Sequence, residues 1–139
     1  CGKSGLATSF LLHALNQGLR GYFIDFSELI NILNRSKADF SEEKTVQAFV
    51  KYDLLLIDEL GYMSCEEDQA SLFFDLLRRR HEKTSTIITT QLGFAEWGSF
   101  LHNQHIVAAL LDRITANCII FNMKDCISIR QKKIVYANK

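Results

Sequence analysis

The feature that most limits the possible folds is the almost uninterrupted apolar run from Tyr52 to Asp58, which ends in two adjacent acids, Asp58 and Glu59. A strand of this kind is typical of a parallel sheet that helices cover on both faces. Acidic side chains at the end of such a strand are costly unless a cation or a reaction uses them. The alternative is that both acids simply end the strand in solvent.

Segments typical of strands and of helices alternate along the rest of the chain, which predicts a single α/β domain with a parallel sheet and helices on both faces. The expected strands are 22–26, 52–58, 86–91 and 118–123, with a short extended piece at 127–130. In the first half of the chain we expect a helix that ends near Gly18, a helix capped by Ser27, a loop at 34–39 and a helix over 41–50. In the second half we expect a helix that follows a Ser64–Glu67 capping box, a short helical turn at 94–97 and a helix that contains 106–114.

The chain opens with Cys1-Gly2-Lys3-Ser4, which matches the last part of the phosphate-binding motif G-x-x-x-x-G-K-[ST]. A bare Gly-Lys-Ser triplet occurs often by chance, and its ordinary interpretation is a helix start with Ser4 as N-cap. Here the triplet does open a predicted helix, and a helix N-terminus suits a phosphate group. Lys3 could then reach the β and γ phosphates of ATP, and Ser4 could bind Mg²⁺.

The triplet and the acidic strand end together predict one site for ATP and Mg²⁺. In this interpretation Asp58 is the second partner of Mg²⁺, and Glu59 polarises the water that attacks the terminal phosphate. Gln91 ends the next predicted strand, where its amide could orient that water, with Thr90 as a second candidate for the role. Gln91 could equally be an ordinary loop residue.

Arg113 lies beside Asp112 on the last predicted helix. Its simpler interpretation is an exposed charge on a solvated surface. The alternative is an arginine finger, a planar cation that is offered to the γ phosphate of a neighbouring subunit. Trp97 is expected to anchor packing rather than to stack on a base.

Charge and hydropathy restrict the partners. Sixteen Lys and Arg residues balance sixteen Asp and Glu residues, so contact with DNA would need a local patch. The two basic clusters, 78–81 and 130–133, favour solvated surface over DNA contact. No apolar run approaches the roughly 20 residues of a membrane span, and no signal peptide is evident, so we expect a cytosolic protein with reduced cysteines.

Cysteine and histidine spacing gives little support for a metal site built on these ligands. The four cysteines form no C-x-x-C pair. His102 and His105 stand three residues apart, but no carboxylate or cysteine completes a site, so surface or capping histidines are expected.

Four segments carry a family resemblance. Leu55–Tyr62 reads L-L-I-D-E-L-G-Y, Ile87–Gly98 reads I-I-T-T-Q-L-G-F-A-E-W-G, Ala109–Ile114 reads A-L-L-D-R-I and Ser128–Arg130 reads S-I-R. They resemble the motifs L-L-I-D-E-L-G-Y, I-I-T-S-N-L-P-F-x-E-W-G, A-x-L-D-R-L and S-Y-R of the IstB-like or DnaC-like branch of AAA+ ATPases, which contains transposition helpers and helicase loaders. The Glu-Trp-Gly feature favours the transposition helpers.

The resemblance implies roles for individual residues. Asp58 and Glu59 match the Walker B acids, and Asp58 would contact Mg²⁺ through water. Gln91 falls at the sensor-1 position, where the family usually has Asn, so its amide is one methylene further out. Arg113 matches the arginine-finger position. Arg130 matches the S-Y-R arginine near the nucleotide, with Ile129 in place of the tyrosine.

The resemblance also implies a three-layer P-loop NTPase fold of the AAA+ type, with strand order 5-1-4-3-2. The central first strand and the start of the phosphate loop would precede residue 1, so we expect residues 1–139 to be a partial AAA+ core. Loss of a central strand leaves backbone groups of its neighbours unpaired. A defective sheet, weak ATP affinity and low activity are therefore expected of the isolated chain.

The implied function is that of a bacterial cytoplasmic ATPase that binds ATP and Mg²⁺. Such a protein forms homo-oligomers on DNA, without sequence preference, through ATP held between subunits, and it assists a partner transposase. One alternative is a helicase loader whose partner is a replicative helicase. Another is a nucleotide-dependent assembly module with little turnover.

Overall fold

A computed structural model describes residues 2–63, 65–102, 104–123 and 126 of the chain. Its sheet has three parallel strands in the order β1-β2-β3, and these are β1 (Gly21–Asp25), β2 (Leu54–Leu60) and β3 (Ser85–Thr90). The central β2 is the strand predicted from the apolar run, and residues 54–58 are all buried in it. The parallel sheet confirms the predicted α/β class.

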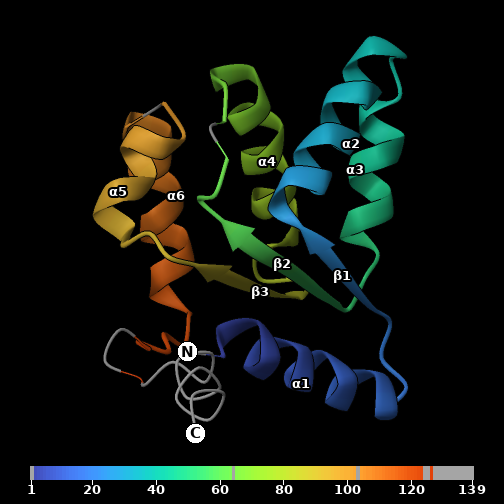
Figure 1. Cartoon of the computed structure of the whole chain (residues 1–139). Helices are drawn as coiled ribbons and strands as arrows, with labels where there is room; N and C mark the ends of the chain where they lie inside the picture. The colour runs from blue at the N-terminus through green and yellow to red at the C-terminus, as the bar shows by residue number, and fades with distance from the viewer. Residues whose placement is uncertain (1, 64, 103, 124–125, 127–139) are drawn as a thin grey trace, which may run out of the picture.

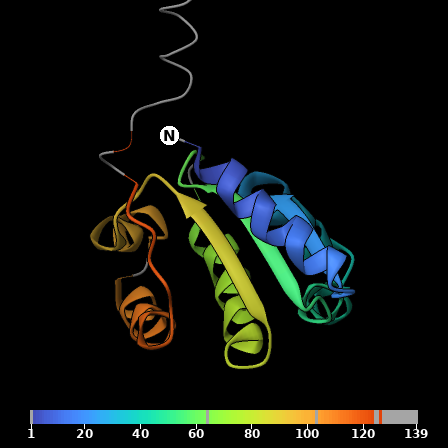
Figure 2. The same cartoon turned by 90° about the horizontal axis from the view of Figure 1, so that it is seen from below.

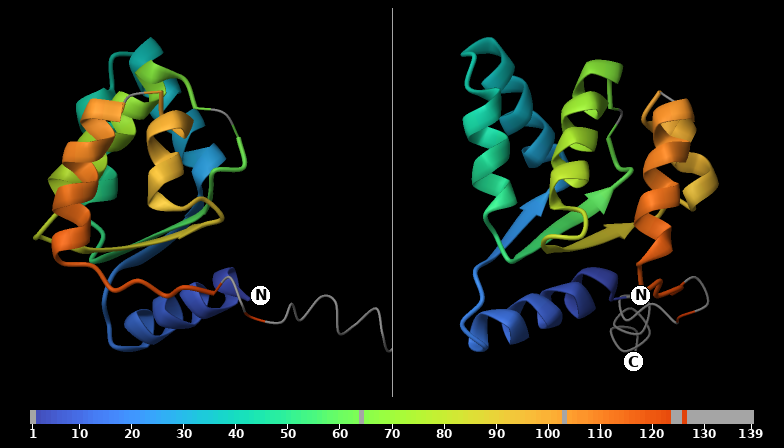
Figure 3. Two further views of the ribbon diagram at one scale, coloured as in Figure 1. Left: turned by 90° about the vertical axis from the view of Figure 1, so that its left-hand side faces the viewer. Right: turned by 180° about the vertical axis from the view of Figure 1, so that it is seen from behind.

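Six helices accompany the sheet in the described part of the chain, and no helix there is both long and apolar enough to cross a bilayer. They are α1 (Lys3–Asn16), α2 (Phe26–Ala38), α3 (Glu42–Val50), α4 (Glu67–Arg80), α5 (Phe94–Phe100) and α6 (Gln104–Ala116). Figure 1 shows α1 below the sheet and α2, α3 and α4 above it. Figures 2 and 3 show that α1 lies alone on its face, whereas α5 and α6 lie near β3 on the side of α4.

Each face of the sheet has its own apolar cluster. On one face Ala7, Leu11 and Ala14 of α1 pack against Leu54 and Leu56 of β2. The opposite face carries the larger cluster, where the alternate strand residues pack against the remaining helices. Because side chains alternate along a strand, β2 presents every second residue to α1.

The predicted loop at 34–39 is wrong, because α2 continues to Ala38. Leu33 and Ser36 are buried on the inward side of the helix, and the Ser36 hydroxyl donates a hydrogen bond to the Leu33 carbonyl at 2.6 Å. Packing against the core therefore extends the helix through this polar stretch, in which Arg35, Lys37 and Ala38 are also good helix formers.

The predicted capping residues of two helices are also displaced. α2 begins directly after Asp25, so Ser27 lies within its first turn. In α4 the capping box pairs Glu66 with Gln69, whose side chain accepts a hydrogen bond from the Glu66 N–H at 3.0 Å. The predicted box began at Ser64, which lies outside the described residues.

The predicted strand at 118–123 is wrong as well, since this segment is irregular. Ile119, Ile120 and Phe121 are exposed, to 84% for Ile119. A strand needs a neighbour for its N–H and C=O groups, and within the described residues the outer edge of β3 has no strand partner. The extended piece predicted at 127–130 lies outside the described residues.

Candidate functional site

The predicted phosphate and metal residues meet where α1 begins and β2 ends. Ser4, in the first turn of α1, donates a hydrogen bond from Oγ to Oδ1 of Asp58 at 3.0 Å. Asp58 continues the alternation of Leu54 and Leu56, so its carboxylate lies on the α1 side of the sheet. The structure therefore brings together two residues that are 54 positions apart in the sequence.

The start of α1 is open to an anion. Gly2 is the N-cap and has a left-handed φ of 79°, a conformation that favours glycine. No side chain caps the helix, and its first turn contains no acidic residue. Lys3 is half-buried and has no hydrogen bond or ion pair within the described residues. The free N–H groups and the positive end of the helix dipole can bind a phosphate.

The two acids lie in a β-bulge. The pairing of β2 with β3 is interrupted after Ile57 and resumes at Leu60, so Asp58 and Glu59 stand opposite Thr89 alone. Asp58 is only 5% exposed, whereas the Glu59 side chain is exposed and its backbone has a left-handed φ of 60°. The bulge thus directs adjacent acids into different surroundings.

Thr89 is a residue of this site that sequence reasoning missed. Its hydroxyl donates a hydrogen bond to Oδ1 of Asp58 and accepts one from the Glu59 N–H at 3.0 Å. The signal that could have identified Thr89 is strand alternation, because Thr89 follows Ile87 on the α1 side of β3.

The oxygen atoms at this junction fit Mg²⁺, which prefers hard oxygen ligands and is usually held by one or two carboxylates, waters and substrate phosphates. Oδ1 of Asp58 accepts two hydroxyl hydrogen bonds, whereas Oδ2 accepts none within the described residues. Oδ2 of Asp58 is therefore the carboxylate oxygen that is available to a cation. No group of three or more histidine, cysteine or acidic side chains in the described ranges forms an independent metal site.

Gln91 follows β3 at the same edge of the sheet, and its side chain is exposed. Its amide donates a hydrogen bond to the Tyr62 hydroxyl, a contact that the sequence did not predict. The Thr90 hydroxyl is engaged with the backbone, since it donates to the Leu60 carbonyl at 2.8 Å and accepts from the Leu92 N–H at 3.0 Å. Gln91 is therefore better placed than Thr90 to meet a ligand.

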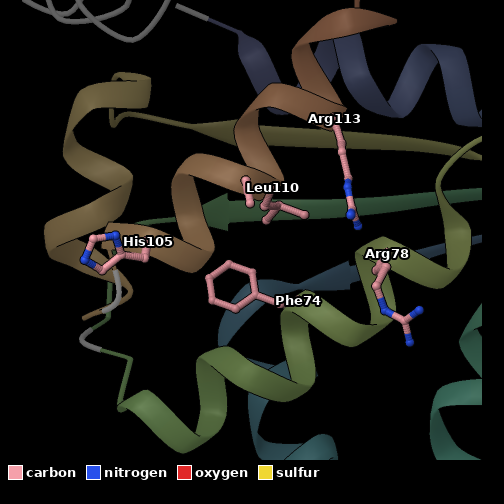
Figure 4. A pocket seen from close by; sticks show the side chains of 6 residues that line it. Phe74, Arg78, His105, Leu110 and Arg113 are labelled. Carbon is pink, nitrogen blue, oxygen red and sulfur yellow. The ribbon is translucent and has the colours of Figure 1, made fainter.

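Arg113 does not join this junction within one molecule. Figure 4 shows it in a groove between α4 and α6, where its side chain extends toward α4. The groove has a volume of about 310 Å³ and is lined by Phe74, Arg78, His105, Ala109, Leu110 and Arg113. The Arg113 carbonyl is 2.9 Å from Nε2 of His81, directly after α4. Since α4 runs back from the carboxyl end of β2, Arg113 lies toward the opposite end of the sheet from Asp58.

The basic cluster 78–81 is solvated only in part: Arg78 is exposed, as predicted, whereas Arg80 is buried, which corrects the prediction at that position. Arg79 binds Glu43 at 2.7 Å and Arg78 binds Asp75 at 2.6 Å. Arg80 is 1% exposed, and burial lowers its pKa to about 10 against the opposing effect of Asp53. These cations are largely used inside the fold, which leaves little of the cluster for DNA phosphates.

The remaining predicted residues have simpler placements. Trp97 is buried and contacts Phe94 with ring centroids 5.7 Å apart, as expected of a packing anchor. His102 and His105 are exposed. Burial raises the pKa of the Cys65 thiol to about 11, so this cysteine is a poor metal ligand at neutral pH. Arg130 and the cluster 130–133 lie outside the described residues.

Comparison with known proteins finds a family model and relatives that this chain resembles over most of its length. The model of a family described as IstB-like ATP binding protein matches residues 1–137. A protein of insertion sequence IS5376 of Geobacillus stearothermophilus, named for ATP binding, is 35% identical over 96% of this chain and 53% of its own length. A similarly named protein of IS21 of Pseudomonas aeruginosa is 36% identical over 88% of this chain and 46% of its own. The chain thus spans about half the length of these relatives.

Solved structures show the same fold. A replication initiator DnaA bound to AMPPCP and single-stranded DNA aligns with a TM-score of 0.71 and 15% identity over 99% of this chain and 43% of its own. The DnaC helicase loader aligns with a TM-score of 0.65 and 24% identity over 81% of this chain and 68% of its own. These likenesses confirm the α/β fold of AAA+ P-loop domains.

Proposed function

This chain belongs to the IstB-like ATP binding protein family, and on that premise we propose that it binds ATP and Mg²⁺ at the junction of α1 and β2. The observation that carries the proposal is the 3.0 Å hydrogen bond between Ser4 and Asp58. It joins a helix start able to bind phosphate to a buried carboxylate able to face a cation. The two halves of the predicted site come from separate motifs, which makes a chance meeting a poor explanation.

The proposed binding roles combine the phosphate-loop motif and the family resemblance with the contact of Ser4 with Asp58. Gly2 lets the backbone turn into the helix, Lys3 pairs with the β and γ phosphates, and the Ser4 hydroxyl is a ligand of Mg²⁺. The family resemblance further suggests that Asp58 holds the ion through water and that Arg130, which lies outside the described residues, acts near the nucleotide. When bound, Mg²⁺ neutralises charge that develops on the phosphates during transfer.

We propose that the chain hydrolyses ATP, with Glu59 as the group that polarises the attacking water and Gln91 as the amide that orients it. Glu59 suits this role because it is exposed beside the buried Asp58, so the two acids need not compete for one ion. Hydrolysis requires Gln91 to turn from Tyr62 toward the water, since its amide is engaged there in the structure.

Glu59→Gln tests the proposal in the complete gene product. We expect ATP binding to persist and turnover to fall by about 100-fold or more, the usual contribution of a general base. Glu82→Gln is the matched control, because Glu82 is also an exposed glutamate with left-handed φ, 63°, but lies in the turn after α4. Absence of Mg²⁺-dependent ATP binding in the wild-type protein would contradict the proposal, and equal turnover in the wild type and Glu59→Gln would remove Glu59 from the mechanism.

Arg113 is proposed to act on the ATP of a neighbouring subunit in a homo-oligomer, because within one molecule it is distant from Asp58. Arg113→Ala should lower assembly-dependent turnover by about a thousandfold and leave the ATP affinity of the monomer unchanged. Arg35→Ala, at another exposed arginine, is the control. Unchanged turnover of Arg113→Ala at saturating protein concentration would exclude the finger role.

We propose that the whole protein assembles on DNA and assists a transposase. Support comes from relatives that are named as insertion-sequence proteins. The alternative partner is a replicative helicase, because the DnaC helicase loader shares the fold. Affinity purification of the complete gene product with ATP distinguishes them: recovery of a transposase supports the proposal, and recovery of the helicase instead contradicts it.

An assembly module with little turnover is a second candidate, favoured by the contact of Gln91 with Tyr62. Such a protein would bind ATP and assemble, but its low turnover would not change in Glu59→Gln. The same assay therefore separates the two functions.

A further inference from the structure

We infer that Thr89 is a positioning residue that holds both acids of the β2 bulge through a single hydroxyl group. The inference rests on the proposed function, because it concerns how Asp58 and Glu59 are presented to Mg²⁺ and to water. Within the described residues no other side chain of β3 forms a hydrogen bond with either acid.

The first contact fixes the carboxylate of Asp58. Thr89 is 8% exposed, and its hydroxyl donates to Oδ1 of Asp58, the same oxygen that accepts from Ser4 at 3.0 Å. A hydroxyl has one proton, so this donation also sets the rotation of the hydroxyl. With both donors on Oδ1, Oδ2 remains the oxygen that can face water or a metal ion.

The second contact fixes the backbone of Glu59. The pairing of β2 with β3 is interrupted at the bulge, and the Thr89 oxygen accepts a hydrogen bond from the Glu59 N–H at 3.0 Å. The left-handed φ of 60° at Glu59 is uncommon for a residue with a Cβ and persists only where the surroundings impose it. Thr89 is the side chain that supplies this constraint.

The two contacts couple the acids to each other. If the Thr89 hydroxyl is lost, Asp58 can rotate and the Glu59 N–H loses its acceptor in the same step. Ser4 cannot replace Thr89, because Ser4 contacts Asp58 alone. Since Ser4 is itself proposed to bind Mg²⁺, Thr89 is the donor whose contacts serve only to orient the acids.

Thr89→Val and Thr89→Ser separate this role from ordinary strand packing. Valine keeps the branched shape without the hydroxyl, and serine keeps the hydroxyl without the methyl group. Thr86→Val is the matched control, because Thr86 lies at the other end of β3 and its hydroxyl also bonds a charged group, accepting from Nε of Arg80 at 3.0 Å.

The first readout is hydrogen exchange of the Glu59 amide in the nucleotide-free complete gene product. We expect exchange to become at least about fivefold faster in Thr89→Val, near wild type in Thr89→Ser and unchanged in Thr86→Val, as loss of one hydrogen bond predicts. Equal exchange of the Glu59 amide in wild type and Thr89→Val would overturn the inference, whatever the protein binds.

The second readout is the increase in nucleotide affinity on addition of Mg²⁺, measured by calorimetry with a non-hydrolysable ATP analogue. Thr89→Val should reduce this increase by about 10- to 100-fold, the usual effect of losing a group that orients a metal ligand, with recovery in Thr89→Ser. A full Mg²⁺ effect in Thr89→Val would also overturn the inference. A wild-type protein without any Mg²⁺ effect contradicts the proposed function instead, and the amide exchange then decides the role of Thr89 in the bulge.

Discussion

Each end of the sheet buries an ionisable side chain, but the two side chains differ in how fully their hydrogen-bonding atoms are used. At the amino end, Arg80 is 1% exposed, and at the carboxyl end Asp58 is 5% exposed. Three carbonyl groups and a hydroxyl accept hydrogen bonds from the Arg80 guanidinium, namely Phe49 O, Tyr52 O, Ser85 O and Thr86 Oγ1, at 2.6 to 3.0 Å. Asp58 has two donors on one oxygen and none on the other within the described residues.

The difference shows how a buried charge can serve structure or chemistry. The acceptors around Arg80 come from the end of α3, the loop before β2 and the start of β3. The guanidinium of Arg80 in α4 therefore joins four segments and keeps little donor capacity for a ligand. The hydrogen-bond partners of Asp58 are two neutral hydroxyls, and within the described residues no cationic side chain forms an ion pair with it. A cation would therefore supply the missing partner of the Asp58 carboxylate, whereas the Arg80 guanidinium already has its partners within the protein.

The largest effect is expected at the amino end. Arg80→Met removes the guanidinium and leaves buried carbonyls without donors, which should lower the free energy of unfolding by about 3 kcal/mol or more. Urea denaturation followed by circular dichroism measures the change. Arg78→Met is the matched control on the same helix, and loss of its exposed pair with Asp75 should cost only about 0.5 kcal/mol. Similar costs for the two variants would show that Arg80 does not stabilise the sheet.

At the carboxyl end we expect Asp58→Asn to lower stability less than Arg80→Met does, and to weaken the binding of Mg²⁺ and nucleotide. Asp58→Asn keeps an oxygen that can accept from Ser4 and Thr89 but removes the buried charge, so stability should change by only about 1 kcal/mol. The Mg²⁺-dependent increase in nucleotide affinity should fall by at least about tenfold, as measured by calorimetry.

Asp53→Asn is the control for Asp58→Asn, because Asp53 precedes the same strand and pairs with Arg20 at 3.2 Å. Hydrogen bonds from Arg20 lower the pKa of Asp53, which marks it as part of a surface ion pair rather than a ligand site. Its substitution should leave the Mg²⁺ effect intact. If Asp58→Asn loses as much stability as Arg80→Met, Asp58 has a structural role like that of Arg80, and the proposed difference between the two ends of the sheet is wrong.

Patterns that depend on near neighbours in the sequence were predicted well. The apolar run identified the central strand, and the alternation of strands and helices identified the parallel sheet, because burial on both faces requires apolar residues at successive positions. The pairing of Ser4 with Asp58 was also anticipated, since both stand at element ends that parallel topology brings to one edge.

Predictions that depended on tertiary partners were less successful. Residues 34–37 are polar, yet the core holds them in a helix, and residues 118–123 are mostly apolar, yet they form no strand. Arg80 stands in a run of arginines typical of solvated surface, and only the carbonyls of distant segments show why it is buried.

The sequence alone determined the α/β class, the central strand and the residue types of the proposed nucleotide site, because periodicity and short motifs record burial and local turns. Only the tertiary structure decided that Thr89 bridges both acids, that Gln91 is bonded to Tyr62 and that Arg113 faces away from Asp58. Those relations depend on strand register and helix packing, in which a shift of one residue changes the face that a side chain occupies.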